Sequence, residues 1–448
     1  MKKTIIPFFL ILFVTSCSMY RPYSRSTEAD FIEYSAKDGS SESVPMWSEL
    51  FASPSLQQLI DSALTRNTDL QMASLRIAES EAALRSARLG YLPSFKVSAS
   101  ASTNGGFEDI VTSLTGNASW QLDVFGSITN AKRKARAVLL ESEAYRDAVQ
   151  TQLVADVAAS YYTLALLRSQ RAVTAETAEA WAQTIDVTKA MKEAGMVNEA
   201  AIAQYEGTYW SVKASLDDYD YSIRKTENAL RSLLVLSPSD DEQTLFRTDE
   251  SEKDLSVDLT GIARSFGAAD IANRPDVIRA EAQLMQAYYA TGIARAALWP
   301  TITITGEGVT DFNFESFGNH LAASLLQPVF NAGSLRAKLR ISEAQQQEAL
   351  LAYEQAFCDA AIEVDDALAS LRAARAKTES CDRQVEALER AADATDALMQ
   401  YGTASTTYLD VLTARRSLLT ARLARLSNAT DEVLSIITLY RALGGGVH

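Results

Sequence analysis

The chain has 448 residues, and its 57 acidic residues outnumber its 42 basic ones to give a formal net charge of −15. This balance argues against nucleic acid as a partner, because binding to phosphates needs clustered cations. The sequence has only two histidines and no CxxC pair, HExxH motif, phosphate-binding glycine loop or Ser/His/Asp set. We therefore predict neither an enzyme nor a bound cofactor or metal.

The start of the chain predicts a secretory signal peptide over residues 1–16. Two lysines precede an apolar run at residues 5–14, which is too short to span a membrane. Small residues then precede Cys17, in a pattern that resembles a bacterial lipobox and predicts that Cys17 becomes the acylated first residue of the mature chain. Ser18 follows it, as in lipoproteins that are passed on to the outer membrane. We expect residues 17–54 to form an extended arm from the lipid to the first helix.

Beyond Cys17 the chain has two further cysteines, Cys358 and Cys381, in one predicted helix. Their separation along that helix is about 35 Å, which is too far for a disulfide between them. We predict that both are buried as small hydrophobic residues.

Two stretches of the chain resemble each other at an offset of 207 residues. "ARLGYLPSFKVSAS" at 87–100 corresponds to "ARAALWPTITITGE" at 294–307, and Gly195 corresponds to Gly402 at the same offset. A period of this length is too long for a solenoid repeat. The sequence therefore predicts an internal duplication in which each half runs helix, strand, strand, helix, helix.

The duplication sets the expected domain boundaries. The first repeat covers residues 55–236 and the second covers 261–443, followed by a short tail at 444–448. Residues 237–260 between them are acidic and break the helical period. We expect this linker to run around the outside of the helices rather than to form a domain of its own.

Alternating side chains predict strands after Pro93 and Pro300, where each proline favours a change from helix to strand. In the first strand Phe95, Val97, Ala99 and Ala101 alternate with Lys96, Ser98, Ser100 and Ser102. Such alternation is typical of membrane strands with lipid on one face and water on the other, and also of a half-buried sheet in a soluble domain. A membrane sheet must be closed, and one chain has four strands where about eight are needed. Closure therefore requires several chains.

Long coiled-coil helices are predicted in both halves. A three-four spacing of apolar residues runs from Ile202 to Leu233 and recurs 207 residues later, from Leu409 to Tyr440; sustained seven-residue spacing indicates coiled-coil packing. Helices near 128–193 and 334–398 contain no proline and would each approach 100 Å. Taken alone, this feature favours a soluble coiled-coil scaffold.

Six stretches together resemble the TolC/OprM-like outer-membrane factors of tripartite efflux systems, in their lipoprotein branch. The stretches, in order along both halves, are "WQLDVFGS" (120–127), "NRPDVIRAEAQL" (273–284), "ARAALWPTITI" (294–304), "QPVFNAGSLRAKL" (327–339), "YLDVLTARRSL" (408–418) and "YRALGGG" (440–446). The resemblance implies an α+β membrane protein. Three identical chains would each give four strands to one twelve-stranded barrel, which a long periplasmic α-helical coiled-coil tunnel continues.

The resemblance places the functional end at the periplasmic tip, which we define as residues 193–201 and 400–408. A periplasmic adaptor (membrane fusion protein) would dock its hairpin there, close to Gly195, Gly402 and Thr406. TolC-like proteins close this end with tyrosine and arginine contacts and with rings of aspartate.

Two residues match the closing positions of that family and two do not. Tyr401 and Asp410 fall on the tyrosine and on the first aspartate, whereas Thr406 replaces the arginine and Thr413 the second aspartate. Three copies of Asp410 would form a ring that attracts cations; alternatively, Asp410 is an exposed acid that the helix dipole favours at a helix start. Other residues could make the closing contact in place of the arginine, namely Glu193, Asp393 or Asp396.

The function implied by the resemblance is a passive exit duct in the outer membrane, anchored in the lipid bilayer through Cys17. An inner-membrane pump of the resistance-nodulation-division (RND) type would drive small molecules through it, and docking of the adaptor would open the tip. The first alternative is the outer-membrane duct of a type I protein-secretion system. The second is a periplasmic coiled-coil scaffold that forms no channel, which predicts no strands.

Overall fold

A computed structural model describes residues 22–24, 46–51, 53–103, 110–195, 197–236, 268–310, 317–326, 333–400 and 407–445. The chain divides into two compact units. The first comprises residues 1–33, 72–146 and 275–358, and the second comprises residues 34–71, 147–274 and 359–448. Two long helices, α5 (Ser127–Glu193) and α9 (Ser334–Gln400), contribute to both units.

The described elements follow the predicted duplication, with one difference. In each half, two strands precede a long helix and a second, shorter helix, α6 (Glu199–Leu234) or α10 (Tyr408–Ala442). The difference is that each half opens with two helices rather than one. These pairs are α3 (Pro54–Arg66) with α4 (Thr68–Leu89), and α7 (Ala268–Ala272) with α8 (Pro275–Ala296).

Asn67 produces the break between α3 and α4. Its backbone is extended at the end of α3, and its side-chain oxygen accepts hydrogen bonds from the backbone of Asp69 at 2.9 Å and of Leu70 at 3.1 Å. Its amide donates to the carbonyl of Leu233 at 3.1 Å. The same side chain therefore caps the start of α4 and ties that start to the end of α6.

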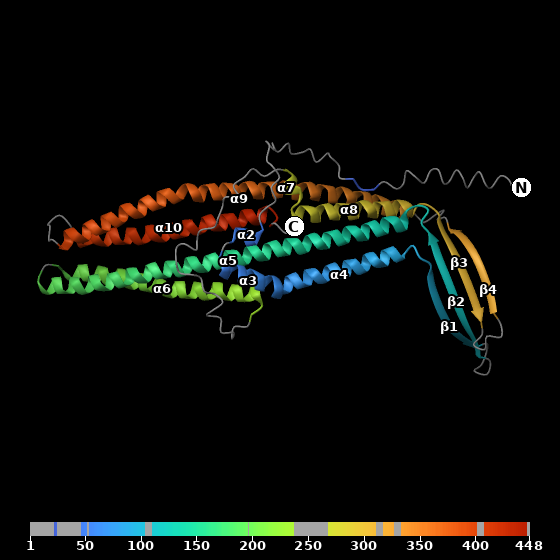
Figure 1. Cartoon of the computed structure of the whole chain (residues 1–448), viewed down its shortest axis with the longest axis horizontal. Helices are drawn as coiled ribbons and strands as arrows, with labels where there is room; N and C mark the ends of the chain where they lie inside the picture. Colours follow the sequence, from blue (N-terminus) through green and yellow to red (C-terminus); the bar gives the residue numbers. More distant parts are fainter. Residues whose placement is uncertain are drawn as a thin grey trace. The chain divides into compact units, whose positions relative to one another are not determined.

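The sheet of the first unit has four antiparallel strands in the order β1-β2-β3-β4 (Figure 1). Their bounds are Ser94–Thr103, Ile110–Leu122, Thr301–Thr310 and Phe317–Leu326. Large apolar side chains on one face lie open in the single chain, with Phe95 77% and Leu321 84% exposed. The register confirms the predicted alternation, because it groups apolar residues on this face and mostly polar ones on the other; an apolar face of this kind suits lipid.

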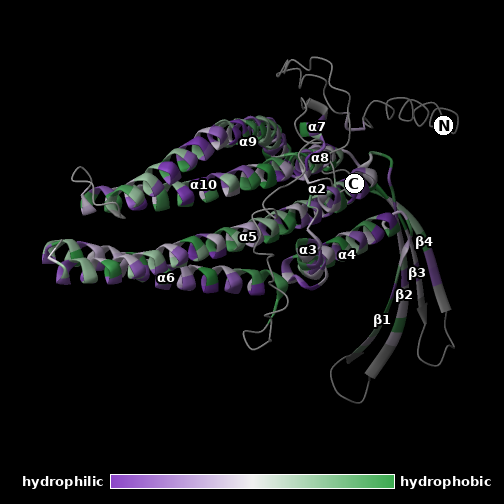
Figure 2. Cartoon of the chain, turned by 60° about the vertical axis from the view of Figure 1, so that its left-hand side comes forward, coloured by the Kyte–Doolittle hydropathy of each residue, from purple (hydrophilic) through white to green (hydrophobic). Residues whose placement is uncertain are grey.

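The core of the second unit lies between its helices. In Figure 1, α5 runs beside α6 and α9 runs beside α10, and hydrophobic and hydrophilic residues alternate along all four in Figure 2. Many residues at the predicted three-four spacing are buried, among them Ile202, Tyr205, Val212, Leu230, Leu412, Leu426, Val433, Ile437 and Tyr440. Leu409, at the start of the second series, is instead 51% exposed. None of the helices in the described ranges combines the length and apolarity needed to cross a bilayer.

The glycines at the end of the chain fit a close contact with α5. Gly445 has a φ of +75°, and a Cβ added there would lie 2.5 Å from the side chain of Thr151. The hydroxyl of Thr151 donates to the carbonyl of Gly444 at 3.1 Å, and that of Tyr440 donates to the carbonyl of Gly445. Glycine is therefore required here both for its conformation and for its small size.

Two expectations from the sequence are corrected by the structure. The prediction that both internal cysteines are buried is wrong, because Cys358 is exposed and Cys381 is partly exposed on the surface of the single chain. The arm expected over residues 17–54 is not extended throughout, because it contains α2 (Trp47–Leu50). Leu50 and the following Phe51 are buried in the core of the second unit, so burial of these side chains fixes that end of the arm.

Candidate functional site at the hairpin ends

The hairpin between α5 and α6 turns through Gly195, which has a φ of +72°. No neighbouring atom would touch a Cβ at this position, so the backbone conformation and not the lack of space favours glycine. Asn198 then starts α6, where its side chain accepts a hydrogen bond from the backbone of Ala201 at 3.1 Å. An ion pair joins Lys192 to Glu199 across the turn. These contacts give the hairpin a defined end.

Asp410 lies in the first turn of α10 and is exposed. Its carboxylate accepts hydrogen bonds from the backbone N–H of Thr407 at 2.8 Å and from the Thr407 hydroxyl at 2.7 Å. These bonds lower the pKa of Asp410 below its usual value because they stabilise the charged form. Asp410 therefore keeps its negative charge at the start of a helix, where it also interacts favourably with the helix dipole.

Arg415, one and a half turns further along α10, connects three helices. Its guanidinium contacts the carboxylate of Asp396 on α9 at 2.7 Å. On α5 it donates to the hydroxyl of Thr184 at 2.5 Å and to the carbonyl of Ala180 at 3.4 Å, and it lies 5.7 Å from the ring centre of Trp181. One side chain thus joins the α9–α10 hairpin to α5.

An aromatic cluster adjoins this contact. The hydroxyl of Tyr205 on α6 donates to the carbonyl of Tyr408 on α10 at 3.0 Å. Its ring lies 5.6 Å from Trp181 and 6.3 Å from Tyr408. Burial raises the pKa of Tyr205 to about 12, so the hydroxyl stays protonated and remains a donor. Buried residues packed in the same cluster are Ala178, Ile185, Val212 and Leu412.

Only part of the tip expected from the sequence lies within the described residues. Tyr401, Gly402 and Thr406 fall outside them, as does Cys17, the predicted lipid anchor, whereas Gly195 and Asp410 have the positions given above. The structure brings Asp396, one of the alternatives for the closing contact, together with Arg415.

Sequence reasoning did not single out Arg415. Its neighbour Arg416 occupies the apolar series of α10, and that series gives no reason to select Arg415. The detectable signal was the spacing of 19 residues between Asp396 and Arg415 around a predicted hairpin turn, which places opposite charges on facing helices.

No group of three or more His, Cys, Asp or Glu side chains that could hold a metal ion occurs within the described ranges. The contacts of Arg415, close to the tip, are hydrogen bonds and an ion pair between helices, and what they can do chemically is to hold two hairpins together or release them.

The family described as "Outer membrane efflux protein" matches residues 59–235 and 269–445, one match in each half of the duplication. The chain belongs to this family. The family is one of efflux channels and not of enzymes. The chain is accordingly the outer-membrane component of an efflux pump, and its fold is that of a trimeric channel made of a barrel and a helical tunnel.

Individual relatives cover almost the whole chain. The cation efflux system protein CusC of Escherichia coli (strain K12) is 30% identical over 99% of this chain and 99% of its own length. The solvent efflux pump outer membrane protein SrpC of Pseudomonas putida is 28% identical over 100% of this chain and 99% of its own. The crystal structure of the open state of the MtrE outer membrane channel of Neisseria gonorrhoeae matches with a TM-score of 0.84 and 26% identity, over 96% of this chain and 98% of that one.

Proposed function

We propose that this outer membrane efflux protein is a passive exit duct for small molecules, driven by an inner-membrane RND pump and opened by a periplasmic adaptor at the tip. The observation that carries the proposal is the contact of Arg415 with Asp396 and Thr184. A polar contact between hairpins can exist in a made and a broken form, and an adaptor that binds the broken form better shifts the equilibrium towards it. The duct itself needs no energy source.

We propose small molecules as the cargo, without a narrower chemical class. CusC is named for cation efflux and SrpC for solvent efflux, yet their identities to this chain are 30% and 28%. So small a difference does not favour one cargo over the other. Both names concern efflux rather than protein secretion, which supports a small-molecule pump as the partner of this duct.

The proposed anchor is an acyl group on Cys17, in addition to the barrel. Several acyl chains attach a protein stably where one does not. Because each chain of the trimer would carry its own lipid, loss of acylation should weaken attachment without altering the channel.

The test of the proposal is single-channel recording from the purified mature protein in planar bilayers, with wild type beside Cys17→Ala. We expect small, cation-selective currents of equal size from both, because the lipid is only an anchor. A trimer that inserts but conducts no current, even after the tip is released by Arg415→Ala, would contradict the duct. A chain that forms no trimer and does not insert would instead support a scaffold.

Asp410→Asn should lower the preference of the channel for cations by about two- to fivefold, because three carboxylates leave the tip. In wild type this preference should persist as the pH falls to about 3.9, the usual range for aspartate. It should be lost only below that range, since the hydrogen bonds from Thr407 lower the pKa of Asp410. Reversal potentials in a salt gradient, recorded from pH 7 to pH 3, measure both effects.

Thr407→Val provides the matched control for this pH dependence. It removes the hydroxyl that donates to Asp410 and keeps the backbone N–H that donates to the same carboxylate. The loss of cation preference should therefore move to higher pH while the preference at pH 7 stays unchanged. A channel whose selectivity is the same with Asp410→Asn would remove Asp410 from the pore.

A further inference from the structure

The titratable side chains of the sheet all lie in one cross-strand row. The four strands contain three such side chains, Lys96 on β1, Glu307 on β3 and His320 on β4. The register pairs Lys96 with Asn117, Asn117 with Glu307, and Glu307 with His320. We call these four residues the polar row. Uncharged polar residues are sufficient on a strand face that contacts water. The presence of every charged side chain of the sheet in one cross-strand row therefore needs an explanation.

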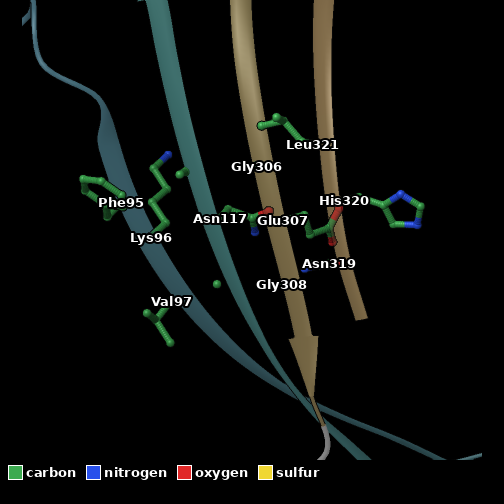
Figure 3. Close-up of a pocket in the computed structure, with 12 residues that line it drawn as sticks. Phe95, Lys96, Val97, Asn117, Gly306, Glu307, Gly308, Asn319, His320 and Leu321 are labelled. Atoms are coloured by element: carbon green, nitrogen blue, oxygen red, sulfur yellow. The ribbon is translucent and has the colours of Figure 1, made fainter. Parts of the chain in front are cut away.

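The polar row lies on the face opposite to the exposed apolar side chains. Residues directly opposed across antiparallel strands share a face. In Figure 3, the side chains of Lys96, Glu307 and His320 point to one side of the sheet, whereas those of Phe95 and Leu321 point to the other. The neighbouring row, which contains Phe95 and Leu321, is apolar or glycine throughout.

In a membrane barrel the apolar face contacts lipid and the polar face lines the water-filled interior. The rest of the polar face is mostly Ser, Thr and Gln, which carry no charge. Because the fold is a trimer, three copies of the polar row line one interior. Strands in a barrel are tilted, so the rows are inclined and together form a staggered belt instead of a flat ring.

We propose that the polar row is a charged belt inside the barrel that sets the local balance between cations and anions. With histidine counted as neutral, the belt has as many positive as negative charges. A belt with balanced charges suits a duct that passes both cations and anions. Loss of Lys96 or of Glu307 would leave an excess of one charge sign and favour cargo of the opposite sign. This inference rests on the proposed duct, because only a water-filled passage gives the belt a role.

A thiol at position 117 can report the local potential, because Asn117 lies directly between Lys96 and Glu307. The experiment uses the lipidated trimer in nanodiscs, with Asn117→Cys as the reporter and with Cys358→Ser and Cys381→Ser to remove the other two thiols. The measured quantities are the reaction rates of this thiol with a cationic and an anionic methanethiosulfonate reagent, at low salt. A unit charge at one strand spacing, screened by about 0.1 M salt, should change each rate about 2.5-fold, and in opposite directions for the two reagents, so their ratio should change about sixfold.

Two variants should move that ratio in opposite directions. Glu307→Gln leaves an excess of lysine, so the cationic reagent should become slower relative to the anionic one. Lys96→Gln leaves an excess of glutamate and should have the reverse effect. Exchanging the two charges, Lys96→Glu with Glu307→Lys, keeps the net charge and should leave the ratio near that of the parent. All effects should shrink at 1 M salt, where screening is stronger.

Ala118→Cys, on the lipid face beside Asn117, is the control for accessibility and should react at least about tenfold more slowly with both reagents. Equal rates at 117 and 118, or a ratio that neither charge variant moves, would overturn the charged belt. These rates do not depend on conduction through the tip. If the rates overturn the belt while single-channel currents are normal, the duct stands. If the rates support the belt but no current flows even in Arg415→Ala, the duct is contradicted, and the belt loses its role in transport while its position inside the barrel stands.

Discussion

Arg415→Ala is expected to raise the open probability of the channel about tenfold or more and to do so without adaptor. Hydrogen bonds to charged groups contribute about 1.5–3 kcal/mol each, and about 1.4 kcal/mol changes an equilibrium tenfold. Arg415 has bonds to Asp396 on one side and to Thr184 on the other, and its side chain is 25% exposed. Loss of the guanidinium therefore removes the charged contact between the α9–α10 hairpin and α5. Single-channel recording measures the open fraction directly.

Arg422→Ala is the matched control for this prediction. Arg422 lies two turns further along α10 and binds Glu389 on α9 at 2.7 Å, so it resembles Arg415 in its contact with α9. Its hydrogen bonds to Glu389 stay within the α9–α10 hairpin, whereas those of Arg415 also reach α5. Arg422→Ala should leave the open fraction nearly unchanged. Equal opening in both variants would show that stiffness of the hairpin, and not the contact with α5, keeps the channel closed.

Arg415→Lys separates the shape of the side chain from its charge. The planar guanidinium can bind Asp396 and the α5 groups at once, whereas an ammonium on a flexible stem cannot reproduce this fork. We expect an intermediate open fraction, closer to that of Arg415→Ala than to wild type. A lysine variant that gates like wild type would assign the effect to charge alone.

The sequence was sufficient to predict those features of the fold that depend on periodicity. Alternation from Phe95 to Ser102 predicted β1, and the absence of proline over 128–193 predicted the continuous helix α5; the structure confirms both. The second helix at the start of each half was missed. Asn67 ends one helix and caps the next. A single capping asparagine can interrupt a helix while the spacing of apolar residues continues on both sides of it, so the spacing alone did not reveal the break.

The tip shows why contacts between helices were harder to predict than the helices themselves. The pairing of Arg415 with Asp396 depends on how far α9 and α10 are rotated about their own axes. The apolar spacing predicts this rotation only to within about one residue along each helix. The position of Asp410 as an exposed acid at a helix start was easier to predict, because it depends on local structure. Its bonds to Thr407 lie within the first turn of one helix.

Arg274→Met should destabilise the protein more than any other single change considered, by about 2–4 kcal/mol, because a hydrogen bond from a charged group contributes about 1.5–3 kcal/mol. The side chain of Arg274 is 6% exposed and contacts the carboxylate of Glu363 at 2.7 Å. It also donates to the carbonyls of Ala360 at 3.2 Å and of Ala442. Methionine keeps much of the volume but donates to none of these groups. The midpoint of trimer dissociation on heating, followed on denaturing gels, measures the loss.

Arg441→Met tests whether burial or the shared partner decides this cost. Arg441 binds the other oxygen of Glu363 at 2.9 Å, but its side chain is 40% exposed, and exposed pairs contribute about 0–1 kcal/mol. Its loss should therefore shift the midpoint only slightly, although both variants remove one donor from the same carboxylate. The difference is that Arg274 also satisfies two backbone carbonyls, one on α9 and one at the end of α10. If the two variants shift the midpoint equally, Glu363 alone carries the energy and the buried bonds to these carbonyls do not.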